Sequence, residues 1–351
     1  MSLQRNITEA GSLTRTYLAA LGAGGWLKLG VVVLFLGGIG VGNLLSNVPV
    51  NPELLPEDGA AGALEAVAAA VAVGVAIYAV FGLLAAVFEF VFVGSLRSRR
   101  LPLRASFRAN LRPGVWLLVF RTAIWLATFA AAGGVGWLLT GGVTDPAAIE
   151  TLQWVAIGSV AVVAVVGVTS VDTLTNVLVV PIMLQEDRGP LGGWRRLAGA
   201  MAGRWSHGLA VLAVAWVVGI ALWLVLLGVG FIVSIIGLLA FAVLASALTE
   251  LHGAFEPVVV VVLIAGILAY QYLVALVTAP VRSYVRYYGL LVLGEADPAL
   301  DLLADRRPPN GSDSIDPAST ESADVESTGS AGTDNEDGTE GVGAGSLADR
   351  T

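Results

Sequence analysis

The feature that most constrains this chain is a series of apolar stretches, several longer than 20 residues, separated by short polar segments. A helix needs about 20 apolar residues to cross the hydrocarbon core of a bilayer. Inside that core every backbone N–H and C=O must be paired within the protein, so such stretches are expected to be helical. The sequence therefore predicts an all-α polytopic membrane helix bundle. The expected spans are 26–45, 64–94, 115–139, 152–184, one that begins near 207, and 257–293.

Charge is divided unevenly along the chain. The net charge of −8 would suit an acidic soluble protein, yet only 13% of the residues are charged, against about 25% in soluble domains. Residues 295–351 hold 14 of the 27 acidic residues and 3 of the 19 basic ones, so the rest of the chain is slightly basic. We therefore expect a transmembrane domain over 1–300 and a disordered, acidic cytoplasmic tail over 301–351, because the tail has too few apolar residues to bury a core.

The basic residues predict the topology. Lys and Arg in short loops stay on the cytoplasmic side of a membrane, and the loops 46–63, 140–151 and 230–256 contain neither. Six spans place every basic group on one side, with both termini in the cytoplasm of a multi-pass protein of the cell membrane. In that arrangement 230–256 extends the fifth span and adds a re-entrant or interfacial piece, whereas a seventh crossing would put the tail outside.

Three amphipathic segments precede spans 1, 3 and 5. In 102–112, Leu103 and Phe107 are followed one position later by Arg104 and Arg108, so a helix would carry adjacent apolar and basic stripes, as helices at a membrane surface do. Each segment leads to a Trp at a span entrance, and these tryptophans are 90 and 89 residues apart. This spacing predicts three repeats of an interfacial helix followed by a helical hairpin; chance placement of interfacial Trp is the alternative.

The candidate polar residues inside the membrane are Glu89, Arg121, Asp172 and Asn176. Such residues are costly in a bilayer and are candidates for function. Glu89 and Arg121 lie at similar depths in spans 2 and 3, and Asp172 lies one helical turn from Asn176 in span 4. A structural ion pair of Arg121 with Glu89 or Asp172 is one interpretation, and a transport site at Asp172 is the other.

Further arginines, in the loops and near the basic ends of the spans, are candidates for contact with anionic lipid headgroups. They are Arg99, Arg100, Arg104, Arg108, Arg195, Arg196, Arg282 and Arg286.

Other chemistry has little support in the sequence. The chain has no Cys and only two His, and it has no phosphate-binding loop or nucleophile elbow, so we predict no catalytic residue, metal site or cofactor. Arg clusters without a soluble domain point to membrane lipids as partners rather than nucleic acid. The acidic tail is a further candidate surface for a protein partner.

Prolines and glycines are expected to shape the helices. Pro181 and Pro280 lie near the basic ends of spans 4 and 6, where a proline frees a carbonyl and can kink a helix. Small residues allow close helix packing. The candidates are Gly22, Gly37, Gly38, Gly40, Gly133, Gly134 and Gly136.

Two segments carry a resemblance to known families. The ends of the even spans, VVPIMLQEDRGPLGGWRRL (179–197) and APVRSYVRYYGLLVLGEADP (279–298), resemble uncharacterised haloarchaeal six-span membrane proteins, as does the use of one lysine beside 18 arginines. Pro181, the acidic pair after it and Trp194 are more weakly similar to the membrane domains of glycerophosphodiester phosphodiesterases. No phosphodiesterase domain is present, so the resemblance implies a membrane bundle over 1–300 and no activity.

These observations favour a non-enzymatic membrane protein that scaffolds or assists lipid or envelope processes. A small-solute or ion transporter that uses Asp172 is the first alternative, and a membrane-embedded lipid enzyme is the second. A transporter predicts a polar cavity that reaches Asp172, and a lipid enzyme predicts polar residues that converge at one interface.

Overall fold

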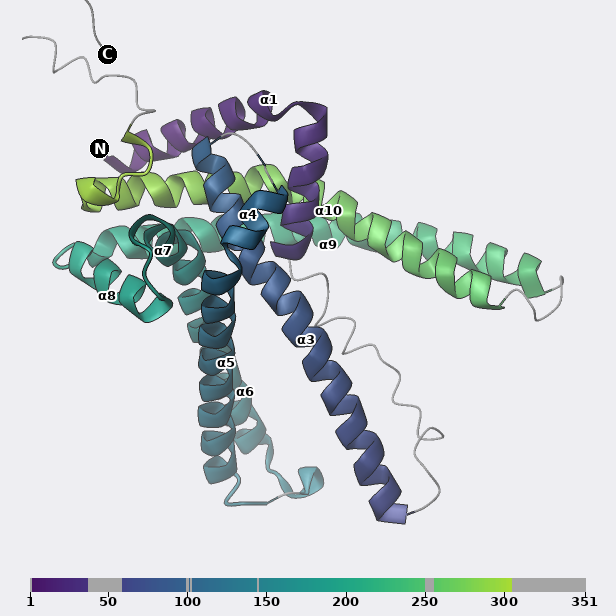
Figure 1. Ribbon diagram of the computed structural model, residues 1–351. Helices are drawn as coiled ribbons and strands as arrows, with labels where there is room; N and C mark the ends of the chain where they lie inside the picture. Colours follow the sequence, from purple (N-terminus) through teal and green to yellow (C-terminus); the bar gives the residue numbers. More distant parts are fainter. Residues whose placement is uncertain are drawn as a thin grey trace, which may run out of the picture. The chain divides into compact units, whose positions relative to one another are not determined.

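The computed structural model describes residues 2–36, 59–98, 101, 103–143, 145–249 and 256–304 (Figure 1). The chain divides into two units, Met1–Arg306 and Arg307–Thr351. The expected disordered tail lies outside the described residues from 305 on. Leu300 and Leu303 are both fully buried, so the packed part of the first unit continues just beyond residue 300.

Every regular element of the described residues is helical, as the sequence predicts. Six helices are long and apolar enough to cross a membrane, judged by their length and composition. The elements are α1 (Ser2–Leu36), α3 (Gly59–Ser98), α4 (Leu103–Ala109), α5 (Leu111–Leu139), η2 (Pro146–Ala148), α6 (Thr151–Leu174), η3 (Thr175–Val179), α7 (Val180–Glu186), α8 (Pro190–Ala200), α9 (Trp205–Thr249), α10 (Glu256–Ala296) and η5 (Pro298–Leu300).

Helix α9 carries the fifth apolar stretch without a break over 45 residues. The expected extension of span 5 is therefore present. A re-entrant turn is absent up to Thr249, and residues 250–255 lie outside the described part of the chain.

Helix α1 consists of two segments joined at a kink. Gly22 has φ 62° and ψ 175°, a left-handed backbone that glycine adopts without steric cost. The segment before Gly22 is the short helix expected ahead of span 1. It packs on the last turns of α10, where the rings of Tyr17 and Tyr287 meet edge to face at 6.1 Å and Arg5 pairs with Glu295 at 3.0 Å.

The segment after the kink runs alongside α10 in the same sense. The hydroxyl of Tyr272 donates to the carbonyl of Leu27 at 2.9 Å, and Arg282 donates to the carbonyl of Leu36 at 3.2 Å, so both residue numbers rise together. A strict alternation of six spans predicts opposite senses for the first and last spans. The parallel course of 27–36 and 272–282 therefore departs from a strict alternation of these two segments, and the placement of both termini on one side remains a prediction.

The remaining long helices pack as neighbours in the chain. Helix α3 packs on α5, α5 on α6, and α9 on α10. The expected short helices precede α5 and α9 as α4 and α8 (Figure 1). This order matches three helical hairpins with a short helix before each, whereas equivalence of the three units stays a prediction.

The buried core lies at the end of the helices that carries the arginines. It contains the last third of α3, the turns around Val177 and Ile182, and the stretch from Tyr287 to Leu293. The first half of α3 and most of α9 expose large apolar side chains, such as Val71 and Phe231. Apolar surface of this extent is typical of helices that face lipid.

Pro181 acts on the turn that precedes it. Because proline has no N–H, it cannot donate to the carbonyl four residues earlier. The residues Thr175–Val179 form a wider π-helical turn, in which the N–H of Val180 donates to the carbonyl of Thr175. Pro280, by contrast, lies within an uninterrupted α10.

The glycines that allow close packing are not the predicted ones. A Cβ on Gly133, Gly134 or Gly136 would meet no atom within 4 Å, and the predicted Gly37, Gly38 and Gly40 lie outside the described residues. Close approaches occur instead where a glycine faces a neighbouring helix. They include Gly30 against Leu276, Gly114 against Val87, Gly193 against Val179 and Gly289 against Val177.

Candidate functional site

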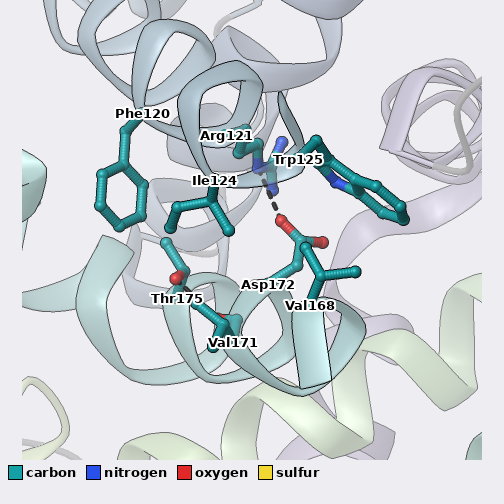
Figure 2. A pocket seen from close by; sticks show the side chains of 8 residues that line it. All are labelled: Phe120, Arg121, Ile124, Trp125, Val168, Val171, Asp172 and Thr175. Atoms are coloured by element: carbon teal, nitrogen blue, oxygen red, sulfur yellow. Dashed lines mark hydrogen bonds and ion pairs between the residues drawn. The ribbon is translucent and has the colours of Figure 1, made fainter. Parts of the chain in front are cut away.

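Arg121 is the centre of a polar cluster within the apolar helices. It projects from α5, and its Nε lies 2.9 Å from Oδ1 of Asp172 on α6 (Figure 2). Its Nη2 lies 3.5 Å from Oε1 of Glu89 on α3 and donates to Oδ1 of Asn176. Asn176 in turn donates from Nδ2 to Oδ2 of Asp172 at 3.0 Å. Both pairings expected for Arg121 are therefore present at once.

A second arginine, which the sequence did not link to this cluster, completes it. Nη2 of Arg286 on α10 forms an ion pair with Oε2 of Glu89, and its guanidinium lies 6.0 Å from the centre of the Phe92 ring. Glu89 and Arg286 are both buried, at 3% and 8% exposure. We call Glu89, Arg121, Asp172, Asn176 and Arg286 the intramembrane charge network.

The network balances its charge and joins five structural elements, α3, α5, α6, η3 and α10. Glu89, Arg121 and Arg286 each lie about ten residues from an end of their helices, so they meet at a similar depth. Two arginines face two carboxylates, which offsets the high cost of placing each ion in an apolar interior. A network of this kind holds α3, α5, α6 and α10 in register.

The cavity beside Asp172 is small, although the Asp172 side chain itself is 35% exposed. The cavity beside Arg121 and Asp172 has a volume of about 10 Å³ and is lined mainly by apolar side chains such as Phe120, Ile124 and Trp125 (Figure 2). That volume holds about one water molecule. The transport interpretation needs a polar cavity of solute size at Asp172, and this cavity is too small for one.

Helix α4 has the two faces that its sequence pattern predicts. Leu103 and Phe107 pack toward the core, and the Phe107 ring lies 5.8 Å from the ring of Phe88 on α3. Arg104 and Arg108 are exposed on the other side. The helix is thus fastened by its apolar face and presents its guanidinium groups outward.

Helix α8 separates its two central arginines. Trp194 donates from Nε1 to the hydroxyl of Thr175 at 3.2 Å, which anchors the helix on the π-helical turn. Arg195 is exposed. Arg196 is held by Oε1 of Glu186 at 2.9 Å and by Oδ2 of Asp297 at 2.5 Å, so it links α8 to the residues that follow α10.

The arginines predicted to contact headgroups therefore fall into different settings. Arg104, Arg108 and Arg195 are exposed. Burial against Glu89 removes Arg286 from the surface, and two carboxylates occupy Arg196, so these placements correct the expectation of headgroup contact for both. Arg282 is half-buried and donates to a main-chain carbonyl. Arg99 and Arg100 lie outside the described residues.

The pair between Arg196 and Asp297 predicts a dependence of stability on pH. Hydrogen bonds from Arg196 and from the N–H of Ala299 lower the pKa of Asp297, and the same carboxylate raises the pKa of Arg196. A carboxyl group whose pKa is lower in the folded than in the unfolded protein stabilises the folded state above the unfolded-state pKa of about 4. This stabilisation is lost as the pH falls through the lower, folded-state pKa.

We expect the wild-type chain to exceed Asp297→Asn in stability by about 1 kcal/mol at pH 6, since the pair is about a quarter exposed. The difference should shrink toward zero near pH 3. Thermal unfolding of both proteins in mild detergent over this range measures it, and an equal gap at pH 3 and pH 6 would show that the carboxylate charge is irrelevant.

Within the described part of the chain, no group of three His, Cys, Asp or Glu side chains is placed to hold a metal ion. A protein-family model described as "Family of unknown function (DUF7544)" matches residues 1–303. No curated protein and no solved structure matches the chain. The similarity to phosphodiesterase membrane domains and a haloarchaeal origin both stay predictions.

Proposed function

We propose that this chain, which belongs to DUF7544, a family of unknown function, is a non-enzymatic membrane protein. In this proposal the protein associates with anionic lipids and scaffolds or assists envelope processes. The observation that carries the proposal is helix α4, which is anchored by Leu103 and Phe107 and exposes Arg104 and Arg108. An exposed guanidinium beside an apolar bundle is well suited to a lipid phosphate, which it binds through two parallel hydrogen bonds.

The exposed arginines also suggest an orientation. We propose that the end of the bundle that carries α4 and α8 faces the cytoplasm of the cell, where basic residues of short loops are retained. The anionic lipids of that leaflet would then lie opposite Arg104, Arg108 and Arg195. We propose that both termini are cytoplasmic and that the acidic tail binds a protein partner there.

The intramembrane charge network supports this proposal over transport. A transport site requires a charged group that a solute can reach and leave, whereas Arg121 is bound by Glu89, Asp172 and Asn176 together. Nη1 of Arg286 is buried without a hydrogen-bond partner among the described residues, but each guanidinium in the network pairs with a carboxylate. We therefore propose that the network maintains the bundle that displays the lipid-binding surface.

The headgroup proposal predicts the effect of removing charge from α4. Each basic residue at an anionic membrane surface contributes about 1 kcal/mol, so Arg104→Ala with Arg108→Ala should cost about 2 kcal/mol of lipid affinity. That corresponds to roughly thirtyfold weaker retention of phosphatidylglycerol, measured by native mass spectrometry of the full chain in mild detergent.

The matched control is Arg5→Ala with Arg204→Ala, which removes two charges from outside α4. This control and the charge-conserving Arg104→Lys with Arg108→Lys should retain more lipid than the alanine pair. Added salt should reduce the difference, because it screens exposed charges. Equal retention by all four proteins would refute a role for α4 in lipid binding.

A further inference from the structure

A cavity of about 320 Å³ is lined by residues of α1, α9 and α10, and its Arg282 lies one helical turn before Arg286 of the charge network. Its volume is at the lower end of the range for small-molecule sites, about 300–1,000 Å³. Leu34 of α1, Leu222 and Leu226 of α9 and Val274 of α10 contribute apolar walls. Such walls suit a hydrocarbon chain better than a polar solute.

The polar groups of the cavity all come from one face of α10. Gln271, Thr278 and Arg282 line it at intervals of seven and four residues, which places them along one side of the helix. The Thr278 hydroxyl already donates to the carbonyl of Ala275 at 3.1 Å. Arg282 is thus the charged group of the cavity.

Arg282 differs from the arginines of the charge network in its partners. Arg121 and Arg286 each pair with a carboxylate, whereas Arg282 forms no ion pair with any described residue and donates from Nη1 to the carbonyl of Leu36. A guanidinium has five N–H donors. Arg282 feels the attraction of Glu89 and the repulsion of Arg286, but no carboxylate of the described residues lies within ion-pair distance of it. A half-buried cation in this position, set in an apolar cavity, has the electrostatic character of a site for an anion.

We infer that this cavity binds one anionic lipid, with its phosphate on Arg282 and an acyl chain along Leu222, Leu226 and Trp223. Trp223 is 60% exposed, so the cavity wall reaches the surface that faces hydrocarbon. A lipid can therefore enter sideways from the bilayer. The site goes beyond the exposed surface of α4, since it holds a single lipid between helices rather than several at the membrane face.

Two variants test the two halves of the site separately. Arg282→Gln removes the charge and keeps a hydrogen-bonding side chain. Gly219→Leu fills the cavity and leaves the charge in place; a Cβ at Gly219 meets no atom within 4 Å, so the backbone accepts the change. Gly228→Leu, on the same helix and equally free of neighbours, is the matched control.

The experiment is native mass spectrometry of the full chain in detergent that contains equal amounts of dioleoyl phosphatidylglycerol and dioleoyl phosphatidylcholine. We expect one phosphatidylglycerol to survive activation that removes the other lipids. Arg282→Gln and Gly219→Leu should each reduce this species at least tenfold, whereas Gly228→Leu should leave it unchanged. Inorganic phosphate should fail to displace it, because a free anion lacks the chain.

Three results would overturn the inference. They are equal retention of phosphatidylcholine, displacement by inorganic phosphate, and retention of the bound lipid in both Arg282→Gln and Gly219→Leu. The variant with Arg104→Ala and Arg108→Ala distinguishes the two proposals, since it should remove the weakly held lipids and keep the single resistant one. Thermal unfolding of each variant shows whether it is folded when tested.

Discussion

Replacement of Glu89 by Met is expected to lower the free energy of unfolding by about 3–5 kcal/mol, the usual cost of leaving a buried charge without its partner. Glu89 is the carboxylate shared by both arginines of the charge network, and it is only 3% exposed. Its loss leaves Arg286 without its carboxylate, while Arg121 keeps Asp172. Unfolding of the full chain in detergent with increasing dodecyl sulfate measures the change.

A double-mutant cycle separates the pair from its surroundings. Arg286→Met alone should cost about as much as Glu89→Met, but the double variant should cost much less than the sum, because well-packed apolar residues often replace a buried ion pair without loss. Arg5→Gln is the control: its pair with Glu295 also joins α1 to α10, yet Arg5 is 64% exposed, so it should cost less than about 1 kcal/mol. Additive costs for the two network variants would contradict a buried, coupled pair.

Gly289→Ala is expected to destabilise the chain by about 1–3 kcal/mol through overpacking. A Cβ at this position would overlap Cγ1 of Val177, and it would lie 3.3 Å from the carbonyl oxygen of the same residue. Val177 is 4% exposed and its branched side chain has little rotational freedom, so it cannot move aside cheaply. The same unfolding measurement applies.

Two further substitutions test whether overlap with Val177 causes this loss of stability. Adding Val177→Ala should recover part of the stability, since it removes the overlapping methyl group. Gly266→Ala, where a Cβ meets no atom within 4 Å, should leave stability unchanged or raise it by about 0.5–1 kcal/mol. If Gly289→Ala and Gly266→Ala behave alike, the contact between α10 and the π-helical turn is looser than described.

Much of the architecture follows from local sequence patterns. The apolar runs predict the long helices, since lipid leaves the backbone no other satisfied conformation, and the four-residue spacing of Leu103 and Phe107 predicts α4. The direction of α1 after Gly22 could not be predicted, because a single left-handed glycine redirects the chain and many glycines in this sequence are equally eligible. Pro181 is the residue in the sequence that could have indicated the π-helical turn. Proline alone does not predict such a turn, because Pro280 lies in a regular α-helix.

The charge network was predicted in part. Arg121, Glu89 and Asp172 lie on consecutive spans, so their meeting follows from the hairpin order. Arg286 belongs to a stretch rich in arginine near the end of the last span, which resembles a headgroup-binding segment in sequence. Only the packing of α10 against α3 shows that it faces Glu89, nearly 200 positions away.

The division of the arginines explains how one basic bundle end can have two roles. Arg121, Arg196 and Arg286 are bound by carboxylates and fasten elements together. Arg104 and Arg108 are exposed, and they are the residues that we propose contact lipid. Stability and lipid association should therefore respond to different substitutions, and each set of variants serves as a control for the other.

The most direct measurement of the central proposal is the lipid that stays with the full chain when it is extracted from membranes made of equal parts of phosphatidylglycerol and phosphatidylcholine. The account predicts that phosphatidylglycerol is enriched severalfold in the purified protein relative to the membrane, as determined by mass spectrometry of the extracted lipids. Equal amounts of the two lipids, as in the membrane itself, would contradict a function in anionic-lipid association.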